Sequence, residues 1–364
     1  MVNVSTSTFS PNYATPPGAI LEEWLTDHDM TQTALAERMN RPIKTINEII
    51  KGKTAITQET AQQLESVTGV EATYWTNAER IYRERAARLD EEELLTSWAP
   101  WAQRFPFTEM TKLGWVTAVQ DPTDKVRSLL RYFGVASPEA WENVYVSQQV
   151  AYRKSAAFRS APAHLSAWLR QGDIFAQRTE CPAYSEEAFH TALLDIRKNT
   201  AAPIAQAHQT LINRCHQAGV VIVFVPELSE THVSGATRWI TSSKALIQLS
   251  LRYKTDDHLW FTFFHEAAHI LLHGKKDVFI EFNHATTPKE QEADQWAADF
   301  LIPQKQWHDL LAGASLKCPE LEGFAKKLQI APSIVVGRLQ HERKIPYVAC
   351  NHLKRKLRLV ASES

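Results

Sequence analysis

Large apolar residues recur with helical spacing between His258 and Gly274, in a stretch that has no proline and no internal glycine. The pattern predicts a mostly buried helix that ends at Gly274, because glycine is favoured just past a helix C-terminus. His265 and His269 interrupt this apolar surface one turn apart, which places their Cβ atoms about 5–6 Å apart on one face. Burying two imidazoles among aromatic residues is costly unless they have a partner.

His265 and His269 have the spacing of a metal site. Two imidazoles one helical turn apart can occupy two of the tetrahedral positions of Zn²⁺. Glu266 is rotated about 100° from His265 on the helix, where a carboxylate beside the metal can act as a general base. The pattern His-Glu-x-x-His arises by chance in roughly four of a hundred such chains. Its position inside an apolar helix favours the metal interpretation.

A second helix, predicted over residues 287–301, offers the third ligand. Thr287 is its expected N-cap. With helical periodicity, Glu290 and Asp294 fall on the inward face, whereas Glu292 falls on the opposite, solvated face. We expect Glu290 to bind the metal and Asp294 to hydrogen-bond a ligand histidine and hold its tautomer. The alternative is that Glu290 only completes a capping box with Thr287.

His273 lies on the same side of the first helix, about 12 Å along its axis from His265. In an unbroken helix it cannot join both other histidines on one ion. We therefore expect it beside the site, behind the ligands, or simply at the helix end, where a histidine is favoured. Tyr253, Arg238 and His273 are candidates for the group that stabilises a developing oxyanion.

Strand-like runs precede the histidine helix, over residues 220–225, 235–240 and 245–251. The second and third runs are expected to form a hairpin around residues 241–244. An edge strand of such a sheet can pair with an extended peptide, which is how many zinc peptidases hold substrate. Together with the helices elsewhere, these runs predict a predominantly helical α+β fold.

Near the N-terminus, apolar spacing predicts three short helices over residues 18–26, 31–39 and 43–51. The tight turn between the second and third is typical of a helix-turn-helix unit, whose second helix enters the major groove of DNA. Side chains that can contact bases or phosphates lie on and around these two helices. We predict DNA contacts from Gln32, Thr33, Lys44, Thr45, Asn47, Lys51 and Lys53.

Charge is consistent with a local DNA-binding surface. Residues 37–53 carry a net charge of +3, while the whole chain carries −1. A nucleic-acid surface must therefore be local. The basic strip favours duplex DNA as the partner, and the alternative is a small helical protein-binding module.

Length and composition predict a folded protein of several domains, with 364 residues, 44% apolar and 22% charged. We predict a disordered lead-in (1–16), a helix-turn-helix domain (17–85), a helical connector (86–215), a zinc metallopeptidase domain (216–310) and C-terminal helices with a basic tail (311–364). In the connector, residues 89–101 and 125–133 are expected to be helical. Trp115, Trp141 and Trp168 are expected to be core residues of helices.

The ends of the chain and its cysteines bear on its surroundings. Cys181, Cys215, Cys318 and Cys350 are scattered, which argues against a disulfide framework and against a cysteine zinc site. No apolar run reaches membrane-spanning length, and no signal-peptide pattern is present. We expect a cytoplasmic protein with no membrane partner. The basic tail, Lys354, Arg355, Lys356 and Arg358, is expected to be solvated, with a nucleic-acid or partner contact as the alternative.

Several motifs, in order, resemble the HigA-type antitoxin repressors of the lambda-repressor-like helix-turn-helix superfamily. They are Pro17-Gly18-Ala19-Ile20-Leu21, Gln32-Thr33-Ala34-Leu35-Ala36-Glu37-Arg38, Gly52-Lys53-Thr54-Ala55-Ile56-Thr57 and Tyr74-Trp75. The resemblance covers roughly residues 17–85. It implies a five-helix DNA-binding domain that is usually dimeric on DNA, and a toxin as a possible partner. Pro42 and Lys44 depart from the family at the start of the recognition helix.

The pattern His265-Glu266-x-x-His269, then Glu290-x-x-x-Asp294, then Phe300-Leu301-Ile302-Pro303 resembles the ImmA/IrrE family of zinc metallopeptidases. The resemblance covers roughly residues 215–310. It implies a gluzincin-like domain in which His265, His269 and Glu290 bind zinc and Glu266 is the base. Members of this family cut helix-turn-helix repressors and so switch on genes. Many members carry no DNA-binding domain in this position.

The motifs and the two family resemblances lead to one functional hypothesis and one alternative. The hypothesis is a homodimeric DNA-binding regulator whose zinc endopeptidase domain cleaves a helix-turn-helix repressor, or the chain itself, to derepress genes. The alternative is a HigA-like antitoxin or repressor whose peptidase-like domain senses a ligand or binds a toxin without proteolysis. Glu266 favours the hypothesis, because a scaffold does not need a base.

Overall fold

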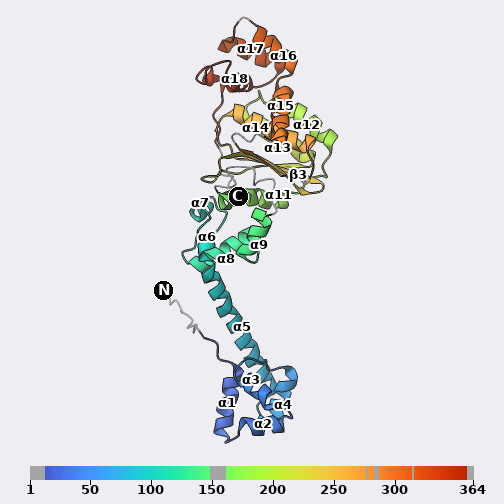
Figure 1. Ribbon diagram of the computed structural model, residues 1–364. Helices are drawn as coiled ribbons and strands as arrows, with labels where there is room; N and C mark the ends of the chain where they lie inside the picture. Colours follow the sequence, from blue (N-terminus) through green and yellow to red (C-terminus); the bar gives the residue numbers. More distant parts are fainter. Residues whose placement is uncertain (1–12, 148–160, 276–277, 283–286, 314, 359–364) are drawn as a thin grey trace, which may run out of the picture. The chain divides into compact units, whose positions relative to one another are not determined.

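The computed structural model describes residues 13–147, 161–275, 278–282, 287–313 and 315–358. These residues form many helices and one small mixed sheet, so the predicted α+β, predominantly helical class is confirmed (Figure 1). Contacts group the chain into two compact units, residues 1–99 and 100–364. Most of the predicted disordered lead-in lies outside the described residues. The finer five-part division remains a prediction.

The N-terminal unit contains the predicted helix-turn-helix arrangement. Its helices are α1 (Pro17–Asp27), α2 (Gln32–Arg38), α3 (Ile43–Ile50), α4 (Gln58–Thr68) and α5 (Ala72–Ser97). Thr31 caps α2, and its hydroxyl accepts a hydrogen bond from the Ala34 amide at 3.1 Å. In the turn to α3, Asn40 has φ 49°, a left-handed conformation that asparagine adopts more readily than most residues. The apolar faces meet in one core that includes Leu21, Leu35, Ile46, Leu64 and Trp75.

Helices also form most of the chain before the sheet. They are α6 (Ala99–Ala102), α7 (Phe107–Lys112), α8 (Pro122–Phe133), α9 (Pro138–Trp141), the π-helical η1 (Glu142–Ser147), α11 (Pro162–Arg178), α12 (Glu186–Asn199) and α13 (Ile204–Gln217). Trp141 and Trp168 are fully buried helical residues. Trp115 is not helical, because Gly114, with φ 72°, ends the turn after α7. The prediction of a helical Trp115 was therefore wrong.

The described residues form a four-stranded sheet in the order β1-β3-β2-β4. Its strands are β1 (Val220–Phe224), β2 (Val233–Thr241), β3 (Lys244–Leu249) and β4 (Phe279–Phe282). β2 and β3 form the predicted antiparallel hairpin, and β1 is parallel to β3. β4 was not predicted; it is short and pairs with β2 from a position beyond the histidine helix.

Two helices cover opposite faces of this sheet (Figure 1). Alternate residues of β2 point to opposite sides. Thr237 donates a hydrogen bond to the backbone of α14 (Asp256–Leu272). Its neighbour Arg238 points the other way, to Asp173 and the Leu169 carbonyl of α11. The largest apolar core lies on the α14 side and includes Leu193, Leu211, Ile247, Trp260, Phe263 and Phe264.

The histidine helix ends where it was predicted to end. α14 stops at Leu272, and His273 has extended dihedral angles of φ −119° and ψ 161°. Gly274 follows this C-cap residue, the position predicted for it, but it does not have the positive φ that is common there. The His273 side chain contacts His269. α15 (Pro288–Leu301) follows β4 and begins at the predicted cap Thr287.

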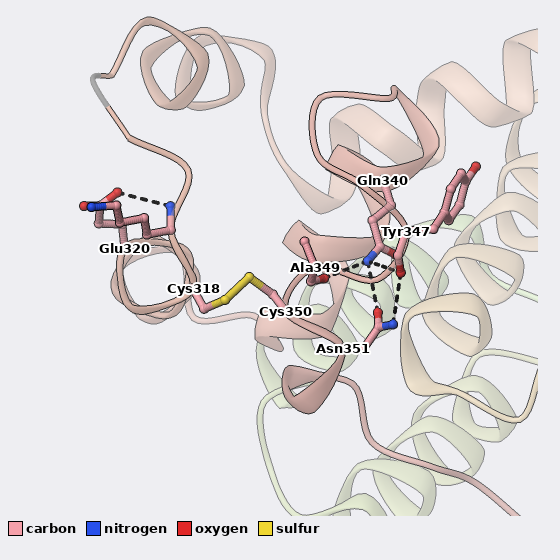
Figure 2. The surroundings of a disulfide bond; sticks show 8 residues. Cys318, Glu320, Gln340, Tyr347, Ala349, Cys350 and Asn351 are labelled. Atoms are coloured by element: carbon pink, nitrogen blue, oxygen red, sulfur yellow. Dashed lines mark hydrogen bonds between the residues drawn. A yellow bond between two sulfur atoms is a disulfide. The ribbon is translucent and has the colours of Figure 1, made fainter.

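The C-terminal part adds α16 (Gln304–Ala312), α17 (Cys318–Leu328), α18 (Pro332–His341) and the short η3 (Asn351–Leu353). Cys318 and Cys350 form a disulfide (Figure 2). The scattered cysteines argued against a disulfide framework, and this one bridge was not predicted. The separation of Cys318 and Cys350 by 32 residues gave no local signal, because only the packing of α17 beside the chain after α18 brings them together.

The basic tail is not simply solvated. Lys354 and Arg355 form ion pairs with Asp257 and Asp256, the first two residues of α14. These pairs use the two positive charges within the fold, so neither the solvated interpretation nor a nucleic-acid contact describes them. Within the described ranges, no helix is both long and apolar enough to cross a membrane.

Candidate metal centre and DNA-binding surface

Three buried side chains from two helices converge on one point. His265 and His269 come from α14 and Glu290 from the first turn of α15, and their ligand atoms all lie within 4.8 Å of one another. The Glu290 Oε2 atom is 2.9 Å from His265 Nε2 and 3.4 Å from His269 Nε2. The two Nε2 atoms are 3.0 Å apart. Tetrahedral ligands about 2.0–2.1 Å from a zinc ion would themselves be roughly 3.4 Å apart.

The outer side of His265 indicates which nitrogen faces the cluster. Its Nδ1 donates a hydrogen bond to the Asp294 carboxylate at 2.8 Å. A neutral His265 then directs the lone pair of Nε2 toward the Glu290 carboxylate. Two sets of lone pairs facing each other at this distance repel unless a cation lies between them. The donor set therefore fits a divalent metal ion.

The orientation and tautomer of His269 are also fixed by an outer hydrogen bond, here through His273. Its Nδ1 lies 2.9 Å from His273 Nδ1, and His273 Nε2 lies 3.3 Å from Glu292 Oε2. If His273 Nε2–H donates to Glu292, His273 Nδ1 accepts the proton of His269 Nδ1. This assignment again leaves His269 Nε2 with a free lone pair toward the cluster. Outer partners of this kind orient metal-binding histidines and fix their tautomers.

The ionisation of the cluster agrees with this arrangement. Burial lowers the pKa of His269 to about 4, so its imidazole is neutral at pH 7. Burial alone would raise the pKa of Glu290, but the adjacent His265 and His269 imidazoles outweigh burial and lower the pKa to about 2. Two histidine nitrogens and an ionised carboxylate are the ligand types that zinc prefers.

Only the backbone half of the capping box, the alternative role for Glu290, is present. The Glu290 backbone N–H donates to the Thr287 hydroxyl at 3.3 Å, as expected at the third residue of a capped helix. Its carboxylate, however, contacts the histidines. The N-cap and the cluster therefore use different parts of Glu290, and the cap does not compete with metal binding.

Glu266 is fully buried and faces β2. A Cβ atom added to Gly235 of that strand would lie 2.6 Å from Glu266 Oε1 and 2.9 Å from Thr262 Cγ2. Gly235 therefore leaves the space that the Glu266 carboxylate occupies. The Thr237 hydroxyl also donates to the Glu266 backbone carbonyl at 3.1 Å. Neither Gly235 nor Thr237 was predicted to contact Glu266, although a glycine inside a strand is a signal of such a close approach.

β4 completes one side of the cluster. The Phe279 ring stacks on the His269 imidazole, with centroids 4.0 Å apart and planes 10° apart. β4 lies at an edge of the described sheet, so an edge strand borders the cluster. Glu292 was predicted to lie on the solvated face alone. Glu292 is 59% exposed, yet it reaches His273.

One of the candidate oxyanion-stabilising residues lies on the other side of the sheet. Arg238 is bound to Asp173 and Gln248 on the far face of the sheet. Tyr253 precedes α14 and stacks on His258, with ring centroids 4.1 Å apart. His273 approaches His269 from the outer side. Arg238 is therefore no longer a candidate for oxyanion stabilisation, because its side chain lies on the face of the sheet opposite α14.

The predicted DNA-contacting residues lie on α2, α3 and the turn that follows α3. The Lys44 side chain is 85% exposed, and its Nζ atom lies 3.9 Å from Glu48 Oε1. Asn47 donates to Gln32 at 3.4 Å, which joins the two helices. Thr33, Lys51 and Lys53 are exposed, and Thr45 is half-buried.

These features define two classes of domain in one chain: a helix-turn-helix DNA-binding domain and a metallopeptidase-type domain. Comparison with known families agrees. Residues 21–75 match the family described as Helix-turn-helix. Residues 215–315 match a peptidase family described as the IrrE N-terminal-like domain. The predicted fusion of a helix-turn-helix segment to an ImmA/IrrE domain is thereby confirmed, and the chain is a regulator with a peptidase-family domain. A comparison with curated proteins finds no match.

Proposed function

We propose that this protein is a DNA-binding regulator with zinc-dependent endopeptidase activity, which cleaves a helix-turn-helix repressor, or itself, to derepress genes. The observation that carries this proposal is the convergence of His265, His269 and Glu290 in a buried cluster. Glu266, the proposed base, is buried on the same helix. A cluster used only as a scaffold would have no need of this carboxylate.

His265, His269 and Glu290 would hold the zinc ion, which would supply Lewis-acid polarisation of a peptide carbonyl. Glu266 takes a proton from the attacking water and returns it to the leaving amine. Asp294 and His273 keep the two imidazoles in the tautomers that bind metal. Gly235 leaves room for the Glu266 carboxylate beside β2.

The expected substrate is an extended segment of another protein. β4 borders the cluster and pairs with β2 on one side, which favours a peptide that adds along its other edge. Exposed linkers between domains can adopt such a conformation, whereas folded domains cannot. Binding of the helix-turn-helix domain to DNA, as a homodimer, would concentrate the peptidase beside other DNA-bound proteins. Cytoplasmic localisation fits this partner.

The test compares the wild-type chain with Glu266→Gln. Each is loaded with zinc and incubated with helix-turn-helix repressors encoded beside its gene, with and without DNA. Products are mapped by mass spectrometry. We expect one or a few cuts near a domain linker with the wild type only, while Glu266→Gln keeps its zinc.

The alternative predicts a different outcome of the same experiment. If the wild type binds zinc and cuts neither the repressors nor itself, the peptidase hypothesis fails. If, in addition, deletion of residues 100–364 alters repression of a reporter, the chain is a HigA-like repressor whose C-terminal unit senses a ligand or binds a toxin.

A further inference from the structure

The Cys318–Cys350 disulfide joins the first residue of α17 to the residue just before η3 (Figure 2). Cys181 and Cys215 are free thiols. Cys318 is partly exposed, whereas Cys350 is 8% exposed. Cys350 also has φ 56°, a left-handed conformation that residues other than glycine rarely adopt. One end of the bridge is therefore a buried residue with an unusual backbone conformation, and the other end is partly exposed.

The chain that follows Cys350 returns to the start of α14. Arg355 donates to Asp256 twice, from its backbone amide at 2.8 Å and from Nε at 2.6 Å. The Lys354 ammonium lies 2.5 Å from Asp257 Oδ2. The Leu357 amide donates to the Lys254 carbonyl at 2.8 Å. Residues 354–357 thus clamp the first turn of α14.

The two aspartates depend on this clamp. Asp256 is fully buried and Asp257 is 6% exposed. Carboxylates near a helix N-terminus are favoured by the helix dipole, but a buried one remains costly unless a cation pairs with it. His265, Glu266 and His269 follow on the same helix, so the clamp holds the first turn of the helix that carries the proposed metal site.

Gln340 of α18 connects the disulfide to the clamp. It is 1% exposed. Its Nε2 atom donates to the Ala349 carbonyl at 2.9 Å, next to Cys350 (Figure 2). Its Oε1 atom accepts from Lys354 Nζ at 2.6 Å. One buried amide therefore contacts both the backbone beside the bridge and the lysine that pairs with Asp257. Movement of the backbone at the bridge would therefore shift the lysine as well.

We propose that the Cys318–Cys350 disulfide is a redox modification site, opened by a dithiol reductant, whose reduction releases residues 351–357 from the first turn of α14. The reductant thiolate attacks the Cys318 sulfur and expels the Cys350 thiolate, which takes up a proton. The second thiol of the reductant then displaces Cys318, and the oxidised cyclic disulfide leaves. Two electrons and two protons pass to the protein. The inference does not require peptidase activity.

Hydrogen exchange of the full-length chain tests the proposal. A Cys181→Ser background removes the partly exposed free thiol, and a phosphine reductant avoids the zinc binding of thiol reagents. Intact mass must first show that the oxidised chain is lighter by two hydrogen atoms than the reduced chain. We expect amides of residues 255–262 to exchange about tenfold faster after reduction. The helices α1–α4 should not change.

Two substitutions separate the bridge from the clamp. Cys318→Ser should exchange like the reduced chain and no longer respond to the reductant. Lys354→Met, kept oxidised, should also exchange faster at residues 255–262, whereas the exposed-lysine control Lys305→Met should not. Zinc transfer to a chelator should be several-fold faster in the reduced chain if metal binds as proposed.

Several results would overturn the proposal. One is a chain that does not form the bridge under oxidising conditions. Another is a bridge whose reduction leaves residues 255–262 unchanged, since the disulfide would then only staple α17. A third is fast exchange on reduction that Lys354→Met fails to reproduce, which would remove the clamp from the route. None of these depends on proteolysis, so a failure of the peptidase hypothesis remains distinguishable.

Discussion

In the N-terminal unit, most of the residues expected to contact DNA are exposed or half-buried on α2, α3 and the following turn. In the C-terminal unit, the three proposed metal ligands are buried between α14 and α15. The free energy of each exposed side chain depends little on its neighbours, because water solvates it. Each buried ligand needs the others, because an unpaired buried imidazole or carboxylate is costly. Substitutions in these two sets of residues should therefore have effects of very different size.

Glu290→Gln should have the largest effect. It removes the charged ligand from the cluster, and we expect zinc content to fall from about one per chain to a small fraction. Glu292→Gln is the matched control, since among the described residues Glu292 reaches the cluster through His273. This variant should weaken zinc affinity by about tenfold or less. Elemental analysis after dialysis measures both. Zinc lost from Glu292→Gln but kept by Glu290→Gln would move the ligand to Glu292.

Gly235→Ala should abolish proteolysis while sparing the metal. The added Cβ atom would lie 2.6 Å from Glu266 Oε1, so the carboxylate must move. We expect activity to fall by about 10²–10⁴-fold, as for loss of a general base. Gly323→Ala, where nothing lies within 4 Å of the added atom, is the control. An active Gly235→Ala chain would show that the position of Glu266 does not matter.

Asp294→Ala and His273→Ala should have intermediate effects, because these residues orient the ligands without forming the cluster. Each should weaken zinc affinity by about 10–100-fold. Competition with a coloured chelator measures the change, and the exposed Gln291→Ala on α15 serves as the control. If neither variant differs from Gln291→Ala, the outer hydrogen bonds contribute nothing to metal binding.

Lys44→Ala should have the smallest effect. Loss of one exposed phosphate contact should weaken operator binding a few-fold and reduce the slope of log affinity against log salt by about one. Arg80→Ala on α5, also exposed, should leave the slope unchanged. Electrophoretic mobility shifts at several salt concentrations provide the measurement. Equal slopes for Lys44→Ala and the wild type would favour the protein-binding interpretation of this unit.

Elements and local pairs could be predicted from the sequence with good success. Apolar spacing located α1–α3, α14 and α15, and the 100° rotation per residue placed Glu290 on the inward face. The β2–β3 hairpin was also predicted, since it depends on neighbouring segments. Apart from the local error at Trp115, the errors fall where contacts are long-range. β4 is a four-residue strand whose pairing partner precedes α14, so its own residues carry little signal.

The same limit applies to the candidate site and to the C-terminal segment. His265, Glu266, His269 and Glu290 were identified because helical periodicity connects them to chemistry. Gly235 and Phe279 were missed, because their roles exist only when the sheet packs against α14. The Cys318–Cys350 bridge and the pairing of Arg355 with Asp256, 99 residues away, leave no trace in local spacing.

The sequence by itself determined which helices form, which of their faces are apolar, and which side chains could bind metal or DNA. These properties follow from the regular geometry of a helix and the free energy of burying apolar surface. The tertiary structure decided which donors meet, which carboxylates receive a cation, and where the basic tail goes. Those outcomes depend on packing between segments far apart in the chain, where the cost of unpaired buried charge selects one arrangement among many.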